Sequence, residues 1–208
     1  MHESEPVDEV GNRHPKFAYP VILDLHDVPV LVVGGGRIGA RKASGLAAAG
    51  ASVRLVAAEV SEHVAFAEIA EVRVGVFEPS DLDDVRLVVT ATGDAGADAA
   101  ISAAARQRGI WTNAADQPID CEFILPAIAR TGRVTVAVST DGASPALARE
   151  LRNVIAELLT DELGMLAEEL AHERLAMQRD GLSTEDVDWT PRVRGGIASA
   201  LGGRSLAP

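Results

Sequence analysis

The chain has 208 residues, of which 47% are apolar, and it carries a formal net charge of −12. That acidic balance argues against nucleic acid as a partner, because phosphate backbones are bound by basic surfaces. No apolar run reaches the ~20 residues of a membrane-spanning helix, so no membrane contact is expected. The single cysteine, Cys121, excludes an intrachain disulfide. These features favour a cytoplasmic protein of one or two domains.

The chain begins with a polar, acidic leader over residues 1–18, which we expect to be flexible. Tyr19–Leu25 is typical of a short extended segment. Val28–Val33 is typical of a buried strand, because its residues are almost all aliphatic. Glycines then occupy positions 34–36, and a helical pattern rich in small side chains runs over residues 37–49.

These glycines belong to a spacing that is typical of dinucleotide-binding loops, Gly34-x-Gly36-x-x-Gly39, between a strand and a helix. Gly34 permits the tight turn after the strand, Gly36 lets the backbone approach a pyrophosphate, and Gly39 lets the helix pack closely on the sheet. The N–H groups and partial positive charge of the helix N-terminus favour phosphate binding. A plain strand–turn–helix connection is the alternative, since glycines also make ordinary turns.

Strand-like and helical runs alternate beyond this loop. We expect strands over residues 52–57, 72–77, 86–92 and 110–114, helices over 60–71 and 94–108, and a helical turn over 81–85. Such alternation predicts right-handed crossovers and a parallel, doubly wound sheet. The predicted fold class is therefore α/β, with a Rossmann-type dinucleotide-binding domain over residues 19–115.

The pattern changes after residue 115. Residues 122–130 and 133–139 flank Thr131-Gly132, which is typical of two strands joined by a turn. The second of these runs alternates between apolar and other residues, as a half-buried strand does. A separate hairpin is therefore expected after the parallel sheet.

Helices are expected after this hairpin. Ser144 followed by a proline predicts the start of a helix that runs to about Leu159, and Thr160 is expected to cap a second helix over residues 161–179. Residues 181–208 contain two Gly-Gly pairs, and we expect them to form a mobile tail.

The choice between NAD and NADP depends on the end of the second strand, where a carboxylate normally binds the ribose hydroxyls. The predicted strand ends at Ala57, and the acid comes two residues later, at Glu59. No Arg or Lys lies between Ala57 and Ser61 to pair with a 2′-phosphate, and this favours NAD. An acid that starts the next helix, placed there by the helix dipole, is an equal interpretation of Glu59.

Ligands of an open α/β sheet bind at the carboxyl ends of the strands. Thr90 and Thr92 close the fourth strand with hydroxyls that suit a nicotinamide ribose, although threonines are common in strands. Asn113 and Asp116 follow the fifth strand. A carboxylate at Asp116 is placed to take a proton beside a nicotinamide, and a turn-forming Asx residue is the alternative of equal weight.

Together these segments resemble the precorrin-2 dehydrogenase family, which includes the N-terminal module of siroheme synthases. The resemblance runs in one collinear order from Tyr19 to about Leu159. It is carried by Tyr19-Pro20, Val32-Val-Gly-Gly-Gly36, Arg41-Lys42, Ala91-Thr92, Asn113-Ala-Ala-Asp116, Cys121-Glu-Phe-Ile124-x-Pro126 and Val136-Ala-Val-Ser139-Thr-Asp-Gly-Ala-Ser144-Pro145. The last three runs are much more specific than the glycine loop.

The resemblance implies NAD-dependent oxidation of precorrin-2 to sirohydrochlorin, on the route to siroheme or cobalamin, by an intertwined homodimer. It implies a dimerisation segment over residues 116–144 and a helical domain over 145–180, ahead of the tail. It also implies Asp116 as the catalytic residue. The expected cofactor-binding residues are Gly34, Gly35, Gly36, Arg37, Ile38, Gly39, Ala58, Glu59, Thr90, Thr92 and Asn113.

A tetrapyrrole rich in carboxylates calls for hydroxyl and basic side chains in the substrate site. Ser139, Thr140 and Arg149 are the expected substrate-binding residues, with Arg41 and Lys42 as further basic candidates. Turn chemistry is the alternative for the two hydroxyls, and a solvated helix face is the alternative for the arginine. The histidines show no metal-ligand spacing, so no metal site is expected.

Three other functions remain open at this point. The same enzyme with ferrochelatase activity would use Asp116 for both steps. A non-catalytic NAD-sensing protein would keep the glycine loop without needing Asp116. A Rossmann-like methyltransferase would normally place an acid at the end of the second strand, where this chain has Ala57.

Overall fold

The computed structural model describes residues 16–202. Most of the predicted leader over residues 1–18, and the part of the predicted tail beyond residue 202, lie outside the described residues. The chain divides into two compact units, one ending at Leu125 and the other beginning at Pro126.

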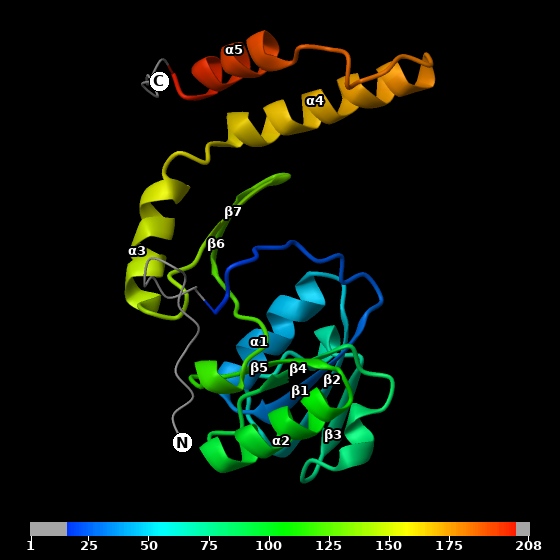
Figure 1. Cartoon of the computed structure of the whole chain (residues 1–208), viewed down its shortest axis with the longest axis vertical. Helices are drawn as coiled ribbons and strands as arrows, with labels where there is room; N and C mark the ends of the chain where they lie inside the picture. The colour runs from blue at the N-terminus through cyan, green and yellow to red at the C-terminus, as the bar shows by residue number, and fades with distance from the viewer. Residues whose placement is uncertain (1–15, 203–208) are drawn as a thin grey trace, which may run out of the picture. The chain divides into compact units, whose positions relative to one another are not determined.

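The first unit is a five-stranded parallel sheet with a helix on each face (Figure 1). Its strands lie in the order β3-β2-β1-β4-β5, which confirms the predicted doubly wound α/β fold. Their bounds are β1 Pro29–Gly35, β2 Ser52–Val60, β3 Glu71–Val74, β4 Leu87–Thr90 and β5 Trp111–Ala114. The helix α1 (Arg37–Ala48) follows β1, and α2 (Ala95–Gln107) follows β4.

The core of this unit consists of two apolar clusters, one on each face of the sheet. Val30 and Val32 of β1 face α1, while Leu31 and Val33 face α2. All four side chains are almost fully buried, because β1 is the central strand and both of its faces are covered. The four buried aliphatic residues of β1 therefore position the glycines at its end.

The segment after β2 differs from the prediction. A helix over residues 60–71 is wrong, because β2 continues to Val60, which pairs with Gly35 of β1. Ser61 then donates its N–H to the Gly35 carbonyl at 2.9 Å, which keeps the backbone extended. Only a 3₁₀ turn, Phe66–Glu68, follows before β3. Tyr19–Leu25, predicted as a short extended segment, forms neither helix nor strand and lies outside the sheet.

The β5 edge of the sheet is closed by Glu122. The Thr112 N–H donates to the Glu122 carboxylate at 2.9 Å, and the Glu122 N–H donates to the Thr112 carbonyl at 2.9 Å. Arg106 of α2 holds the other oxygen of the same carboxylate at 2.6 Å. Because of these contacts, the chain beyond residue 115 stays with the first unit as far as Leu125.

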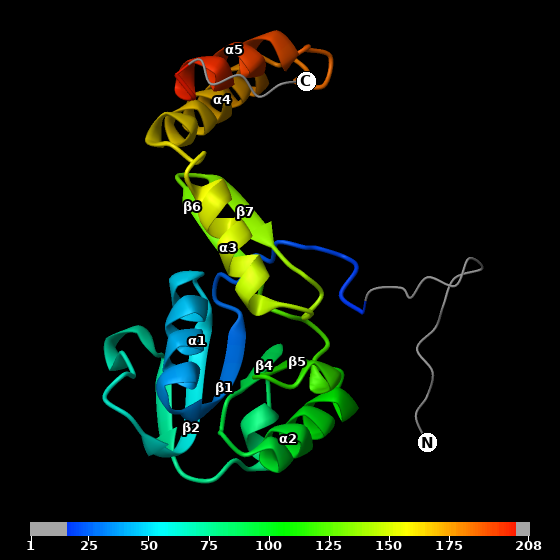
Figure 2. The same ribbon diagram turned by 90° about the vertical axis from the view of Figure 1, so that its left-hand side faces the viewer.

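The second unit contains an antiparallel hairpin and three helices, which can be followed in Figure 2. The antiparallel pairing of β6 and β7 confirms the predicted hairpin. The cap residues Ser144 and Thr160 are also as predicted, since each hydroxyl accepts an N–H from the first turn of its helix. No helix among residues 16–202 is long and apolar enough to cross a membrane. The elements are β6 Ala127–Thr131, β7 Val134–Val138, α3 Pro145–Ala156, α4 Asp161–Arg179 and α5 Thr190–Ala200.

The helix α5 lies in the segment over 181–208 for which no element was predicted. It runs beside α4, and a Cβ at Gly196 would come within 2.5 Å of the Leu166 side chain. Arg192 of α5 also pairs with Glu169 at 2.8 Å and Glu173 at 2.9 Å. The glycine that indicated a flexible tail instead lets two helices approach closely.

Candidate functional site

The glycine loop, Gly34–Gly39, joins β1 to α1 and has two positions where a side chain does not fit. Gly34 has a φ of +122°, and a Cβ there would lie 2.1 Å from the Ala91 carbonyl oxygen. A Cβ at Gly39 would lie 2.0 Å from the Gly34 carbonyl oxygen. These two glycines are therefore required by the packing of β1, β4 and α1, as the spacing predicted.

The third glycine faces open space. Among the described residues, a Cβ at Gly36 would meet no atom within 4 Å, and Arg37 and Ile38 beside it are exposed. Gly36 begins α1 without a side-chain cap, and the first turn contains no acid. By contrast, Asp94 caps α2 by accepting the N–H groups of Gly96 and Ala97. The uncapped N-terminus and the space beside Gly36 fit the pyrophosphate of a dinucleotide.

The end of β2 lies against this loop. A Cβ at Gly35 would come within 2.3 Å of the Glu59 carbonyl oxygen, and the side chains of Ala58 and Glu59 are exposed. No helix starts after Glu59, so its interpretation as a helix-initiating acid is wrong. The carboxylate is left on an extended strand beside the loop, where a ribose hydroxyl is its expected partner.

The two threonines at the end of β4, Thr90 and Thr92, are placed differently from the expectation. Thr90 is fully buried, and its hydroxyl has no hydrogen-bond partner among the residues that the structure describes. The Thr92 hydroxyl donates to the Asp98 carboxylate of α2 at 2.9 Å. The Thr90 hydroxyl is therefore not accessible to a cofactor, and the Thr92 hydroxyl ties the end of β4 to α2.

Asn113, at the end of β5, is buried and bound on both sides of its amide. Its Oδ1 accepts a hydrogen bond from Lys42 Nζ at 2.8 Å, and its Nδ2 donates to the Phe123 carbonyl at 3.0 Å. Burial lowers the pKa of the Lys42 amine, and so does the charge of Arg41 next to it. The side chain of Asn113 thus connects β5 with α1 and with Phe123, so its amide groups are occupied by protein contacts.

Asp116 lies on a tight turn immediately after β5. It has a φ of +59° and its side chain is exposed. The Ala115 N–H still donates to the Thr90 carbonyl at 2.9 Å, and the Gln117 N–H donates back to the Ala114 carbonyl at 3.3 Å. Asp is one of the few residues that adopt this left-handed conformation readily, so the turn and catalytic interpretations are compatible.

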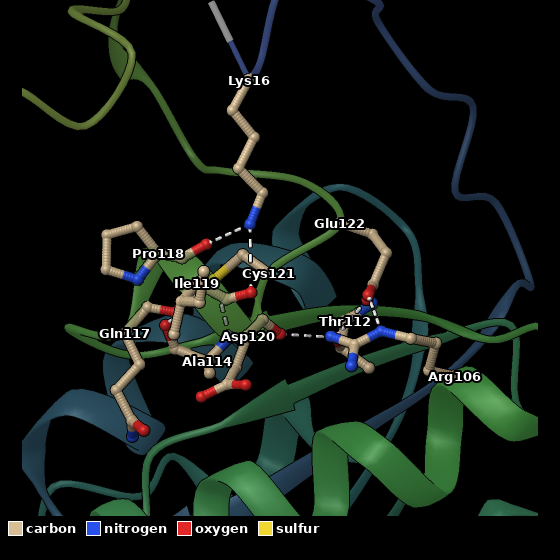
Figure 3. A network of polar contacts seen from close by, with 10 residues as sticks. All are labelled: Lys16, Arg106, Thr112, Ala114, Gln117, Pro118, Ile119, Asp120, Cys121 and Glu122. Atoms are coloured by element: carbon tan, nitrogen blue, oxygen red, sulfur yellow. Dashed lines mark hydrogen bonds and ion pairs between the residues drawn. The ribbon is translucent and has the colours of Figure 1, made fainter. Parts of the chain in front are cut away.

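The Asp116 loop, residues 115–120, is contacted by the buried thiol of Cys121, whose neighbours Ala114 and Gln117 are drawn in Figure 3. Cys121 Sγ accepts the Ala114 N–H at 3.1 Å and lies 3.3 Å from both the Ala114 and Gln117 carbonyl oxygens. Burial raises the pKa of this thiol, so it remains a neutral hydrogen-bonding group. No local pattern in the sequence indicated these contacts of Cys121.

Lys16, near the start of the chain, also contacts the Asp116 loop. Its Nζ donates to the Pro118 carbonyl at 2.6 Å and to the Ile119 carbonyl at 3.1 Å (Figure 3). Sequence reasoning missed this residue, because no local pattern connects a lysine in the predicted leader with a loop about a hundred positions later.

The expected substrate residues belong to the second unit. The Thr140 hydroxyl bonds both the N–H and the carbonyl of Ser144, at 3.0 and 3.1 Å, and Ser139 Oγ accepts the Asp141 N–H at 3.2 Å. Both hydroxyls therefore stabilise the turn before α3. Arg149 is exposed on α3. Within residues 16–202, no three His, Cys, Asp or Glu side chains form a group that could hold a metal ion.

Two protein-family models match the chain. One, described as putative NAD(P)-binding, matches residues 21–127. The other, described as the central part of a sirohaem biosynthesis protein, matches residues 132–158. The first match covers the glycine loop and the Asp116 loop, and the second covers the turn before α3 and α3 itself.

Siroheme synthases are similar to the chain over most of its length. That of Methylococcus capsulatus is 44% identical over 153 residues, and that of Methylobacillus flagellatus is 43% identical over 164 residues. These matches cover 71% and 77% of this chain but 32% and 35% of those proteins, so the chain spans about a third of their length. A solved structure named "SirC, precorrin-2 dehydrogenase" matches with a TM-score of 0.63 and 27% identity, covering 88% of this chain and 97% of that one.

Proposed function

This chain belongs to the family of precorrin-2 dehydrogenases and siroheme synthase N-terminal domains, and we propose that it oxidises precorrin-2 to sirohydrochlorin with NAD⁺. One observation carries the proposal beyond the family. The uncapped N-terminus of α1 and the exposed carboxylate of Asp116 both lie at the carboxyl ends of the strands of one sheet. That edge is where open α/β sheets bind ligands.

NAD is the cofactor of this domain. We propose that the backbone of Gly35 and Gly36 and the first turn of α1 hold its pyrophosphate, with Glu59 at the adenosine ribose. When bound, NAD⁺ supplies the acceptor for the hydride that leaves the macrocycle. The segment from Ala57 to Ser61 has no cation for a 2′-phosphate, which supports NAD over NADP.

Asp116 is the proposed base. Oxidation of precorrin-2 removes a hydride and a proton, and the Asp116 carboxylate takes the proton from a pyrrole nitrogen or ring carbon. Its side chain is exposed, so substrate can reach it, while the contacts of Cys121 and Lys16 fix the backbone that carries it. Positioning of this kind is what general base catalysis requires.

The carboxylates of the substrate need cationic partners. We propose Arg149 as one of them, because it is exposed on α3 and a guanidinium binds carboxylates in a bidentate manner. Ser139 and Thr140 shape the turn that precedes α3, and we propose that this turn, rather than their hydroxyls alone, contacts the substrate. We assign the reaction to the cytoplasm, since the free, buried thiol of Cys121 suits a reducing compartment.

We further propose that the enzyme acts as a homodimer. Three large apolar side chains spaced along one face of α3 are 42–62% exposed: Leu147, Leu151 and Val154. A continuous exposed apolar face of this kind marks a protein interface, and the resemblance to the family points to a second copy of this chain. Sedimentation should give a dimer mass, which Leu151→Glu should reduce to a monomer mass. Asn153→Glu, on the same helix, is the control.

The activity is tested by mixing the purified protein with precorrin-2 and NAD⁺ under anaerobic conditions. NADH and sirohydrochlorin should appear together, in equal amounts, and replacement of NAD⁺ by NADP⁺ should slow the reaction. Tight binding of NAD without turnover would overturn the proposal in favour of an NAD-sensing protein. The same preparation, given preformed sirohydrochlorin and Fe²⁺, measures whether metal insertion exceeds the spontaneous rate.

A further inference from the structure

Lys42 makes a contact that cofactor binding does not explain. It lies on α1, the helix whose first turn belongs to the glycine loop. Its Nζ nevertheless donates to Asn113 Oδ1, near the end of β5, at 2.8 Å. In the sheet order, β4 lies between β1 and β5, so the contact connects the helix after the central strand with the edge strand. Among the described residues, no other side-chain hydrogen bond of Asn113 involves α1.

Asn113 in turn contacts the segment that follows the Asp116 loop. Its Nδ2 donates to the Phe123 carbonyl at 3.0 Å and lies 3.7 Å from Cys121 Sγ. Cys121 in turn holds Ala114 and Gln117, the residues on either side of the Asp116 turn. One side chain on α1 is therefore linked, through a buried amide and a buried thiol, to both ends of the turn.

The charge of Lys42 is set by the same neighbours. Burial lowers the pKa of its amine and the adjacent Arg41 lowers it further, while the Asp116 carboxylate offsets part of this effect. A protonated amine makes a stronger hydrogen bond to a carbonyl oxygen than a neutral amine does. The link to Asn113 is therefore strongest while Lys42 carries its proton.

Building on the dehydrogenase function proposed above, we propose that Lys42 is a positioning residue, whose protonated amine ties Asn113 to α1 and so holds the Asp116 loop in register with the glycine loop. Hydride and proton must leave the substrate toward two different parts of the protein. Small errors in the relative placement of such groups reduce rates strongly. This role differs from the substrate contact that the sequence suggested for Lys42, because the amine binds protein and is half-buried.

The order of the loop can be measured without turnover, by amide hydrogen exchange of the substrate-free protein with and without NAD⁺. Lys42→Met should raise exchange at residues 113–121 roughly tenfold, since a link that restrains local opening is lost, and Lys42→Arg should keep most of the protection. Arg54→Met removes one positive charge from β2 and is the matched control, with no change expected at residues 113–121. Unchanged exchange in Lys42→Met would overturn the proposal, whatever the activity of the wild type.

Kinetics separate positioning from binding. Lys42→Met should lower kcat roughly tenfold while the KM for precorrin-2 and the Kd for NAD change about twofold or less. A raised KM with unchanged kcat would instead make Lys42 a substrate contact, and a parallel loss of NAD affinity would make it a cofactor contact. Either result overturns the positioning role. A wild type without turnover would overturn the proposed function and leave the exchange result standing.

The pH profile tests the charge. The groups that face the amine are Arg41 on its own helix and Asp116 and Cys121 from the segment after β5. Because the pKa of Lys42 lies below that of an ordinary lysine, wild-type kcat should fall at basic pH as the amine loses its proton. Arg keeps its charge, so Lys42→Arg should move this fall to higher pH. Coincident basic limbs in the two proteins would show that the charge is not needed.

Discussion

The glycine loop and the Asp116 loop lie at the carboxyl ends of the strands of one parallel sheet, but they are held by different means. The glycine loop depends on the absence of side chains, because a Cβ at Gly34 or Gly39 would collide with backbone oxygens. The Asp116 loop depends on the presence of side chains, namely Lys16, Cys121 and Asn113. An extended cofactor can be bound by backbone alone, whereas the position of a single carboxylate depends on the side chains that surround it.

The two loops also differ in how much of each is marked by a local sequence pattern. The glycine loop is marked by the spacing of residues 34–39, although Gly34 packs on Ala91 and Gly35 on Glu59. Lys16 contacts Pro118 across 102 positions, and Lys42 contacts Asn113 across 71. Substitutions should therefore affect the two halves of the site separately: the glycine loop through cofactor affinity and the Asp116 loop through the rate of reaction.

The largest effect is expected from Asp116→Asn. Asn tolerates the left-handed turn as well as Asp does, so the fold should be unchanged, while removal of a general base should reduce kcat by ~10² or more. The Kd for NAD should stay near that of the wild type, measured by fluorescence titration of the same preparations. Asp120→Asn, with the same change of charge in the same loop, is the control. Near-wild-type turnover in Asp116→Asn would remove this residue as the base.

The glycine loop should show the opposite pattern. In Gly36→Ala the new Cβ meets no protein atom, so the thermal midpoint should barely change. The Kd for NAD should rise roughly tenfold, or about 1.4 kcal/mol, because the methyl group occupies space at the pyrophosphate. Gly39→Ala should instead destabilise the fold by about 1–3 kcal/mol through overpacking. Equal NAD affinity in Gly36→Ala and the wild type would show that the cofactor does not approach there.

This difference explains what the sequence could reveal. The glycine loop and the caps at Ser144 and Thr160 were predicted, because each is marked by a pattern of residues close together in the sequence. Asp116 was proposed as a site residue from its place after a strand and from the family resemblance, and it stays a prediction. Nothing local indicated that Lys16 would reach its loop.

The errors have the same origin. The predicted helix after β2 is replaced by strand, because Val60 pairs with Gly35 of a different strand. The helix α5 was missed because the Gly195-Gly196 pair was interpreted as flexible. Its second glycine is what lets α5 approach Leu166 of α4. In both places a tertiary contact decided the conformation over the local pattern.

The smallest effect is expected at Glu122, which closes the β5 edge of the sheet and follows the Asp116 loop. Burial works against ionisation of this carboxyl, but hydrogen bonds from Thr112 and Arg106 outweigh it, so the pKa of Glu122 is lowered in the folded protein. A lowered pKa means that the ionised form stabilises the fold. That contribution is complete above the ordinary glutamate pKa and is lost as the pH falls through the folded-state pKa.

Glu122→Gln should therefore reduce the free energy of unfolding by about 1 kcal/mol at neutral pH, since the partly exposed pair is screened by solvent. The difference from the wild type should shrink as the pH falls below about 4, because the unfolded carboxyl takes up its proton there before the folded carboxyl does. Urea denaturation at both pH values measures this, with Glu71→Gln, in the exposed pair with Arg54, as the control. A difference that persists undiminished at low pH would mean that Glu122 acts through its shape at the β5 edge rather than through its charge.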